Sequence, residues 1–452
     1  MEKQMDMTSG SLGDKIIKYA IPLAVTGILQ QLFNAADLAV VGQFSGKGAM
    51  AAVGSNAPVI GLLVNLFVGI SLGSNVIIAK SIGQGDEEKI SKAVHTSVVV
   101  ALLGGVFLAV LGEFVAPEVV NMLEVPGDVY PLAVKYLRIY LAGMPVILLY
   151  NFEAAIFRSC GNTQTPLAAL VISGILNVAL NLFFVLRLGM DVDGVATATV
   201  LSNLVSSVIL FAALMKTKLA VKIIPRRLRV HWDVFGQILR VGIPAGVQGM
   251  IFSFANLIVQ SAVNSLGTTV MAASSAAFNL EIFAYYFMNS FGQACTTFVG
   301  QNFGAGKGDR CRRVLKLTLI QSLVSTSLAC GVILLFSRPL LSIFNPDPDV
   351  IAIGRLRMEY IFFAYLFGLV QEAFSGYLRG FGVSFIPAAC SVIGVCGVRL
   401  TWIFTVFKQS PSFVTVVQVY PISLGITALV LLAVTLLVKP SGRYIVQTET
   451  LK

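Results

Sequence analysis

The sequence predicts an all-α polytopic membrane protein with twelve transmembrane helices in two six-helix lobes related by an internal repeat. Three observations support this fold class. Of the 452 residues, 56% are hydrophobic and 12% are charged, and the mean hydropathy is +0.84. A soluble protein carries roughly a quarter charged residues, so lipid must cover most of this surface. Apolar runs long enough to cross a bilayer recur along the chain, and landmarks of the first half return about 221 residues later.

The repeat is visible in three separate landmarks. Their positions are Ile21-Pro22 and Ile243-Pro244, Ile82 to Gly85 and Phe303 to Gly306, and Arg158, Gly161 and Pro166 against Arg379, Gly382 and Pro387. A duplicated apolar chain is typical of secondary transporters, in which two repeats rock about a shared site.

Charged or Gly/Pro-rich turns separate the apolar runs. They are expected at about 15–41, 50–79, 92–114, 134–157, 165–186, 194–215, 236–264, 269–299, 314–336, 354–378, 383–407 and 413–438. The predicted organisation is therefore an N-terminal lobe (1–215), a basic linker (216–233) and a C-terminal lobe (234–452). The first run follows a polar start and lacks a small-residue cleavage site. We expect it to remain as the first span and not to be removed as a signal peptide.

Basic residues orient these spans. With both termini in the cytoplasm, 23 Lys and Arg residues fall on the cytoplasmic side, eight fall outside, and Arg399 lies within a span. The loop after the sixth span is the most basic, with Lys216, Lys218, Lys222, Arg226, Arg227 and Arg229. The positive-inside rule then favours a multi-pass protein of the cell inner (plasma) membrane with cytoplasmic termini. The net charge of +10 reflects this topology, so we expect a lipid bilayer as the partner and no nucleic acid. We further expect the protein to be a monomer.

Enzyme and cofactor signatures are absent from the sequence. The stretch Gly300 to Gly308 has Gly308 after Lys307, where a phosphate-binding loop needs Ser or Thr. The six cysteines form no CxxC pair, which argues against a metal site or a disulfide framework. His95 and His231 lie near predicted cytoplasmic ends, where we expect solvated side chains. We therefore expect no enzyme activity and no cofactor.

Polar residues within apolar spans are the candidate functional groups, because a charge there is costly and tends to face a cavity. The first span carries Gln30, Gln31, Asn34 and Asp37, and three of these follow helical spacing. Pro22 lies upstream and can bend this helix. The alternative for Asp37 is a solvated position at the outer end of the span.

Other spans add oxygen-bearing side chains. Asn177 and Asn181 share a helix face in the fifth span, and Thr197 and Thr199 lie in the sixth. Alone, such residues more often make helix-packing hydrogen bonds. Together with Asp37 they could bind a hard cation such as sodium, or the carboxylate could bind a proton.

The second half lacks a counterpart of Asp37, since the repeat places Ile258 or Val259 there. It offers Asn256, which corresponds to Asn34, and Glu281, for which a cavity role is expected. Glu153 and Glu372 lie near Arg158 and Arg379, where an interfacial structural role is equally expected.

The chain resembles the multidrug and toxic compound extrusion (MATE) family over roughly residues 12 to 438. The resemblance rests on the segments Ile21-Pro22, Phe33 to Gly42, Arg158 to Pro166, Gly194 to Thr199, Phe298 to Gly306 and Tyr377 to Gly380. It implies two six-helix lobes around a central cavity that opens alternately to each side. It also implies export of amphipathic, often cationic drugs or toxic metabolites in exchange for H+ or Na+.

The resemblance further assigns roles to individual residues. It places the family's amino-lobe acid at Asp37, its bending proline at Pro22, its asparagine at Asn177 and its threonine at Thr199. A tyrosine of that cluster corresponds to Tyr140, and Gln30 falls where similar proteins contact drugs. Two departures matter: some members carry an acid where this chain has Asn181, and others carry an acid near Gly368, where this chain offers Glu372 instead. Ion coupling through Asp37 is therefore the better expectation.

An alternative function is a flippase of lipid-linked oligosaccharides, from a related group of transporters. Such proteins often have more spans and a cavity rich in Arg or Lys for pyrophosphate. Here Arg399 is the only base that the sequence places clearly within a span. A receptor or channel is disfavoured by the two-lobe repeat and the missing pore-loop signature.

Overall fold

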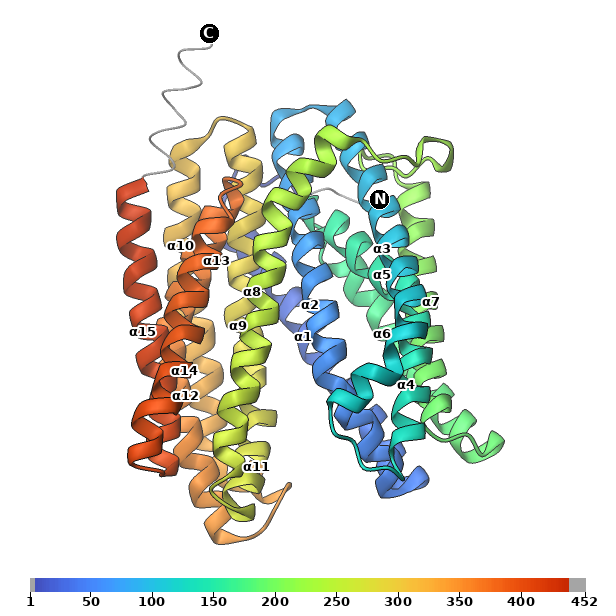
Figure 1. Ribbon diagram of the computed structural model, residues 1–452. Coiled ribbons are helices and arrows are strands. Elements are labelled where there is room, and N and C mark those ends of the chain that lie inside the picture. Colours follow the sequence, from blue (N-terminus) through green and yellow to red (C-terminus); the bar gives the residue numbers. More distant parts are fainter. Residues whose placement is uncertain (1–4, 439–452) are drawn as a thin grey trace. The chain divides into compact units, whose positions relative to one another are not determined.

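The computed structural model describes residues 5–438, and this range is helical with no β-strand (Figure 1). Each of the twelve predicted spans corresponds to a long helical segment. Within residues 5–438, eight helical runs, or nine with one bent pair, are long and apolar enough alone to cross a membrane. One of those runs, Gly13–Gln84, contains the first two predicted spans. The segments α9 and α12 fall outside this set, and both bury charged side chains.

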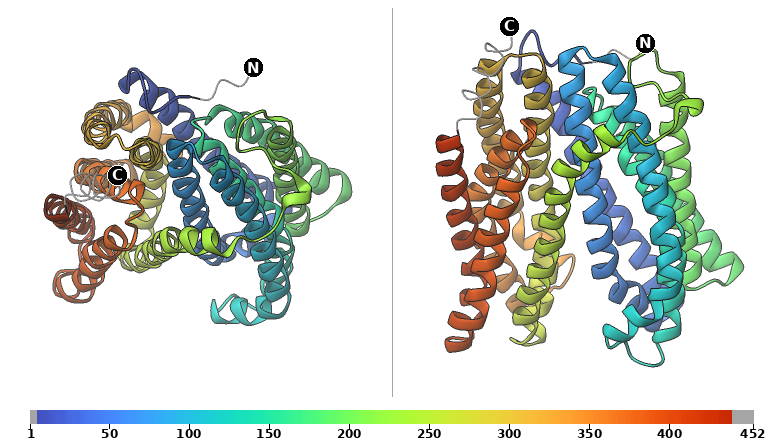
Figure 2. Two further views of the ribbon diagram at one scale, coloured as in Figure 1. Left: turned by 90° about the horizontal axis from the view of Figure 1, so that it is seen from above. Right: turned by 45° about the horizontal axis from the view of Figure 1, so that its top comes forward.

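Unit 1 comprises mainly Val25–Ile82 and Asp86–Gly242. Its elements are the second part of α1 (Gly13–Val40), η1 (Val41–Ser45), α2 (Gly46–Gln84), α3 (Glu87–Met122), α4 (Tyr130–Ala142), α5 (Met144–Ser159), α6 (Gln164–Leu182), η2 (Phe183–Arg187), α7 (Val192–Lys216), η3 (Pro225–Arg227) and the start of α8 (Trp232–Asn264). Helix α3 packs on α4 and α5, and α7 packs on α4, α5 and α6, as Figures 1 and 2 show.

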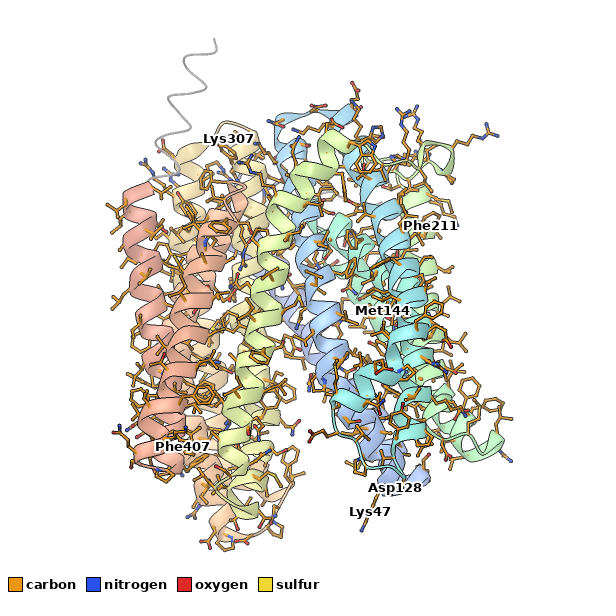
Figure 3. All side chains as sticks on the ribbon, in the orientation of Figure 1. Lys47, Asp128, Met144, Phe211, Lys307 and Phe407 are labelled. Atoms are coloured by element: carbon orange, nitrogen blue, oxygen red, sulfur yellow. The ribbon has the colours of Figure 1, made fainter. Side chains whose placement is uncertain are left out.

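The fourth predicted span is broken in this unit. Helices α4 and α5 meet at an angle of 48° around Gly143. Pro145 lies in the first turn of α5, where its missing N–H is tolerated. A Cβ on Gly143 would overlap the side chain of Val200, so the small residue permits close contact with α7. Met144, labelled in Figure 3, begins α5 and is fully buried.

Unit 2 comprises mainly Asp6–Ala24 and, within the described residues, 243–438. Its elements are the first part of α1, most of α8, α9 (Thr268–Gly304), α10 (Gly308–Leu335), α11 (Ser337–Ser342), α12 (Pro348–Gly380), α13 (Phe385–Ser391), η4 (Val392–Gly397), α14 (Val398–Trp402), η5 (Ile403–Phe407) and α15 (Phe413–Val438). Helix α12 packs on both α9 and α15. A Cβ on Gly376 would overlap the carbonyl oxygen of Gly292, so α9 and α12 approach each other at backbone distance.

Helix α1 contributes to both units, with Ala24 in unit 2 and Val25 in unit 1. The segment before it is held within unit 2. Asn302 donates to the carbonyl of Met7 at 3.0 Å, and Arg310 donates to the carbonyl of Ser9 at 3.1 Å. The Tyr19 hydroxyl lies 3.0 Å from that of Thr297. The predicted lobe boundaries at residues 215 and 234 stay a prediction.

The repeat is visible in the backbone as paired left-handed glycines. Gly85 and Gly306 have φ of 69° and 71°, and Gly161 and Gly382 both have φ of 83°. Residues with a Cβ rarely adopt this conformation. The N–H of Gly161 donates to Arg158 at 2.9 Å, and that of Gly382 donates to Arg379 at 2.8 Å. The duplicated motifs therefore build equivalent turns.

Among residues 5–438, π-helical segments lie within or directly after three of the predicted spans. These are η1 after α1, η2 after α6, and η4 and η5 on either side of α14. Phe407, labelled in Figure 3, ends η5. The wider turn of a π-helix is uncommon and occurs frequently at functional sites.

Candidate functional site

The first candidate site is a carboxylate in unit 1. Asp37 lies in the last turn of α1 and is only 9% exposed. Its Oδ1 accepts a hydrogen bond from Asn181 Nδ2 at 2.5 Å, and its Oδ2 accepts one from the Thr199 hydroxyl at 3.1 Å. The solvated alternative for this residue is therefore wrong. Asp37 is a buried acid held by side chains of α6 and α7.

The two asparagines of α6 extend this cluster. Asn181 Nδ2 lies 3.4 Å from Asn177 Oδ1, and Asn177 Nδ2 lies 3.5 Å from the Thr199 hydroxyl. Asn181 is fully buried, and its Oδ1 has no hydrogen-bond donor among residues 5–438. A buried oxygen without a donor is costly. It is therefore a natural ligand for a cation that enters beside the carboxylate.

The Thr199 hydroxyl has two acceptors but a single hydrogen. It lies 3.1 Å from Asp37 Oδ2 and 3.0 Å from the carbonyl oxygen of Val195. A hydroxyl donates one hydrogen bond at a time. When it donates to Val195, its lone pairs can turn toward a ligand at Asp37.

A glycine brings the two helices of this cluster together. A Cβ on Gly174 would overlap the ring of Phe33, so α6 can approach α1 only because this position lacks a side chain. Gly174 precedes Asn177 and Asn181 by three and seven residues, which places all three on one face of α6. The same face therefore carries both the close approach and the amide ligands.

Tyrosines of α4 lie beside this cluster without bonding to it. Tyr136 and Tyr140 each interact electrostatically with Asp37, and their ring centroids are 6.1 Å apart. No hydrogen bond joins Tyr140 to Asp37 in the part of the chain that the structure describes. Among the earlier positions of α1, Gln30 and Gln31 are half-buried and Asn34 is exposed. Their amides have no side-chain bonds within residues 5–438 and are available to a ligand.

A second polar cluster occupies unit 2. Glu281 of α9 accepts from Arg357 of α12, with Nη2 to Oε1 at 2.6 Å and Nε to Oε2 at 3.2 Å. Both side chains are buried, and Arg357 also donates to Ser274 at 2.9 Å. Glu281 therefore does not present a free carboxylate.

Arg399 of α14 is the other cation of this cluster. Its Nη1 donates to Asn256 Oδ1 at 2.7 Å, and its Nε donates to the Ser423 hydroxyl at 3.3 Å. The ring of Tyr420 lies 4.7 Å from the Arg399 guanidinium and 5.6 Å from that of Arg357.

Sequence reasoning missed Arg357 and Tyr420 in this cluster. Its sequence position places Arg357 among the eight basic residues expected outside the membrane, but the structure buries its side chain. The only available signal was its place three residues inside the predicted tenth span.

The two other candidate acids, Glu153 and Glu372, belong to neither of these clusters. Glu153 is fully buried and accepts from the Ser207 hydroxyl at 2.9 Å. It forms no ion pair with Arg158 among the described residues. Glu372 interacts electrostatically with Arg379, whose Nη2 donates to Gln248 Oε1 at 2.7 Å.

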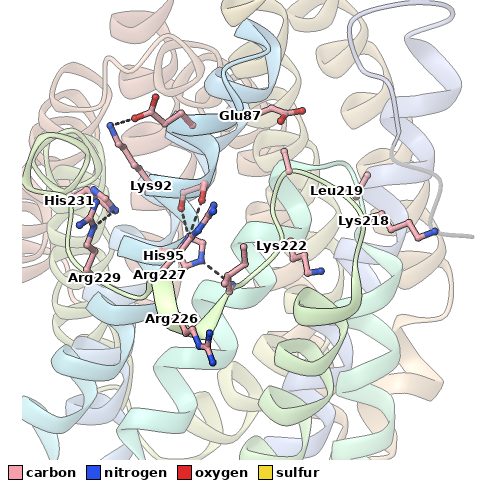
Figure 4. Close-up of a pocket in the computed structure, with 14 residues that line it drawn as sticks. Glu87, Lys92, His95, Lys218, Leu219, Lys222, Arg226, Arg227, Arg229 and His231 are labelled. Carbon is pink, nitrogen blue, oxygen red and sulfur yellow. Dashed lines mark hydrogen bonds and ion pairs between the residues drawn. The ribbon is translucent and has the colours of Figure 1, made fainter.

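A basic pocket of about 750 Å³ lies where the linker meets the start of α3 in unit 1 (Figure 4). Its cationic lining residues are Lys92, Lys218, Lys222, Arg226, Arg227 and Arg229. His95 is buried here, and its Nε2 accepts from the Ile224 N–H at 3.0 Å, so the expected solvated role is wrong for this histidine. Partial burial, together with the charges of Arg229 and Lys92, lowers the pKa of His231. The pocket concentrates the positive charge that the sequence places in the linker.

Comparisons with known proteins agree with this architecture. The MatE family model matches twice, over residues 22–183 and 244–405. The chain is 30% identical to "Probable multidrug resistance protein NorM" of Thermotoga maritima, covering 87% of this chain and 85% of the relative. It is 28% identical to "Probable multidrug resistance protein YoeA" of Bacillus subtilis, with 91% of each covered. A "FAD transporter" of Shewanella oneidensis is 24% identical, with 78% of each covered.

Solved structures show the same fold. A MATE in complex with MaL6 superposes with a TM-score of 0.90 at 21% identity, and the match covers all of both chains. The two matches of the family model begin 222 residues apart, so they follow the repeat read from the sequence. The chain belongs to the MatE family of multi-pass membrane transporters.

Proposed function

We propose that this protein is a secondary active exporter of amphipathic, often cationic drugs or toxic metabolites. It works by alternating access and exchanges its substrate for H+ or Na+ at Asp37. The observation that carries the proposal is the buried carboxylate with two amide side chains and a hydroxyl around it. The names of the NorM and YoeA relatives support multidrug export. The protein acts as a monomer in the inner membrane with cytoplasmic termini and needs no cofactor.

The coupling step rests on the charge of Asp37. An ionised carboxylate among buried helices is costly, and a bound proton or sodium ion neutralises it. For sodium, the ligands would be Asp37, the unpaired Oδ1 of Asn181 and the Thr199 hydroxyl, with its hydrogen turned to Val195. Oxygen ligands of this kind suit a hard cation.

Helix α1 supplies a route from this site to the rest of the molecule. Its first part belongs to unit 2 and its second part, with Asp37, belongs to unit 1. The boundary between the units falls after Ala24, and Pro22 lies two residues before it. Proline removes one helical hydrogen bond, which makes the helix easier to bend there. A change of charge at Asp37 can therefore act on both units through one helix.

The membrane potential can supply energy for this exchange when it moves one net charge, as when a neutral or zwitterionic substrate leaves in exchange for one ion. Exchange of a singly charged cation for one ion moves no net charge and depends on the ion's concentration gradient. Moving one charge through 100 mV is worth about 2.3 kcal/mol. At about 1.4 kcal/mol per tenfold change, one ion supports a substrate gradient of about fortyfold.

The flippase alternative is not favoured by the second cluster. Glu281 neutralises Arg357, so Arg399 is the single uncompensated cation of that cluster in the described chain. Binding of a pyrophosphate group requires several uncompensated cationic side chains.

Asp37→Asn tests the proposal. We expect it to abolish ion-driven efflux of ethidium from everted vesicles, measured separately with an imposed Na+ gradient and an imposed pH gradient. The gradient that drives efflux in the unmodified protein identifies the ion. Glu153→Gln is the matched control, because it also neutralises a buried acid of unit 1, and it should retain efflux. If Asp37→Asn retains ion-driven efflux, the assignment of Asp37 is wrong.

A further inference from the structure

The second cluster leaves one buried positive charge uncompensated. Glu281 and Arg357 neutralise each other through two hydrogen bonds. Arg399 is 4% exposed, yet its side-chain partners are the neutral groups of Asn256 and Ser423 and the ring of Tyr420. A buried charge without an opposite charge is strongly disfavoured. A guanidinium kept under this condition within a membrane span is expected to have a function.

Arg399 also keeps donors in reserve. Its Nη2 has no hydrogen-bond partner within the described part of the chain. A guanidinium has five N–H donors and matches carboxylate and phosphate groups with two parallel bonds. Asn256, which bonds to the neighbouring nitrogen, is exposed. A ligand that contacts Asn256 therefore lies next to the unused edge of Arg399.

This cluster occupies the positions that the repeat pairs with the Asp37 site. At an offset of about 221 residues, Asn256 corresponds to Asn34, Tyr420 corresponds to Thr199, and Arg399 lies one residue beyond the counterpart of Asn177. The π-helical segments η2 and η5 correspond in the same way. The same helices of each half thus form a polar cluster, and the buried charge is negative in one half and positive in the other.

We propose that Arg399, with Asn256 beside it, binds an acidic group of the transported substrate, either a carboxylate or a phosphate. This inference rests on the proposed export function and narrows its substrate class. The preferred substrates are amphipathic compounds that carry an anionic group, including zwitterions, and cations without an acid bind more weakly. The Asp37 cluster keeps its separate role with the coupling ion.

Two dyes with the same three-ring skeleton test the charge preference. Fluorescein carries a carboxylate, and rhodamine 6G is a cation whose acid is esterified. We expect purified protein to bind fluorescein saturably, measured by fluorescence anisotropy, and to bind it more tightly than rhodamine 6G. Adding benzoate or inorganic phosphate as a competitor should displace fluorescein, and the stronger competitor identifies the preferred acid.

Asn256→Asp provides the sharpest variant. It places a carboxylate against Arg399 Nη1 and leaves the guanidinium intact, so an internal ion pair competes with the ligand. Fluorescein affinity should fall by about tenfold or more, as expected when a hydrogen bond to a charged group is lost. Rhodamine 6G affinity should change by less than about twofold. Arg399→Gln should give the same selective loss.

Gln260→Glu is the matched control. Gln260 lies one turn further along α8, is exposed and bonds to Asn264, so the new charge is not against Arg399. It should leave fluorescein binding within about twofold of the unmodified protein.

Two results would overturn the anion site. One is an absence of saturable fluorescein binding, and the other is an equal loss in Asn256→Asp and Gln260→Glu. Ion-driven ethidium efflux by the unmodified protein keeps the two proposals distinguishable. If that efflux is present and is abolished by Asp37→Asn, a failed dye test rejects the anion site alone.

Discussion

At the scale of single residues, the Asp37 cluster depends on few atoms with unequal roles. The carboxylate supplies the charge, while Asn181 supplies both a donor at 2.5 Å and an unpaired buried oxygen. Thr199 can donate to Asp37 or to Val195, but not to both at once. Removal of this hydroxyl should therefore have opposite effects on the two candidate ions.

Thr199→Val should identify the coupling ion by the direction of its effect. Without the hydroxyl donor the carboxylate holds a proton more readily, so half-maximal proton-driven efflux should move to higher pH by roughly one unit. If the ion is sodium, one ligand is lost and the Na+ concentration for half-maximal efflux should rise about tenfold.

Thr199→Ser keeps the hydroxyl and should restore the unmodified values in either case. A Thr199→Val protein with an unchanged ion dependence would remove Thr199 from the site.

These residues differ in how well sequence predicts them. The sequence predicts Asp37, Asn177, Asn181 and Thr199 together, because each is a polar group inside an apolar run. The family resemblance adds support for Asp37, Asn177 and Thr199, whereas Asn181 departs from it. Arg357 was not expected, because a base near the end of a predicted span resembles a loop residue. Its partner Glu281 lies 76 residues away in sequence, and only the packing of α9 on α12 brings them together.

At the scale of helices, close packing depends on positions without side chains. The lengths of the apolar runs predict the twelve spans, but they do not predict the π-helical segments or the 48° break between α4 and α5. Both features depend on local hydrogen bonding, which hydropathy does not measure. The contact of Gly174 with Phe33 is of the same kind, since a glycine in an apolar run carries no sign of what approaches it.

Gly174→Ala should therefore disturb the Asp37 cluster through the helices that hold it. The new methyl group would overlap the Phe33 ring and push α1 away from α6. Overpacking of this kind costs about 1–3 kcal/mol. We expect a lower thermal unfolding midpoint of the purified protein and weaker ion-driven efflux.

The double variant Phe33→Ala with Gly174→Ala should recover efflux, because the ring that blocks the methyl group is gone. Gly54→Ala in α2 is the control, since its Cβ would meet no atom within 4 Å. A double variant as impaired as Gly174→Ala alone would show that packing against Phe33 is not the cause.

At the scale of the whole molecule, α1 is one of the helices that contribute to both units, as α8 also does. The segment that precedes α1 and the first residue of α1 are held to the rest of unit 2 by hydrogen bonds. Their backbone carbonyls accept from the side chains of Asn302, Lys307, Arg310 and Gln321.

Asp6 stabilises the start of this segment, where its carboxylate accepts hydrogen bonds from Thr8 and Ser9. The Ser9 hydroxyl, with help from Thr8, lowers the pKa of Asp6 from 3.8 to about 2. A carboxylate whose pKa is lowered by folding stabilises the folded protein at pH values above its unfolded pKa. This stabilisation is lost as the pH falls toward 2. The anchor is therefore insensitive to pH between 5 and 8, where proton coupling would be measured.

Arg310→Gln should separate the anchoring of α1 from ion binding. Arg310 donates to Asn302 Oδ1 at 3.1 Å, to the Ser9 carbonyl at 3.1 Å and to the Gly10 carbonyl at 3.2 Å. Hydrogen bonds from a charged donor contribute about 1.5–3 kcal/mol each. Their loss should raise hydrogen exchange in residues 6–24 at least about tenfold, as measured by mass spectrometry.

Efflux should fall in Arg310→Gln, because a loosened helix no longer passes a change at Asp37 to unit 2, while the half-saturating ion concentration stays the same. Arg313→Gln is the matched control on the same helix, since its side chain is exposed and makes no hydrogen bond or ion pair within residues 5–438. Surface substitutions of this kind change stability by about 0.5 kcal/mol or less, so this variant should behave like the unmodified protein. If residues 6–24 exchange freely in Arg310→Gln and efflux is nevertheless unchanged, coupling does not pass through the anchored part of α1. The ion site would then have to act on the second unit through contacts other than this shared helix.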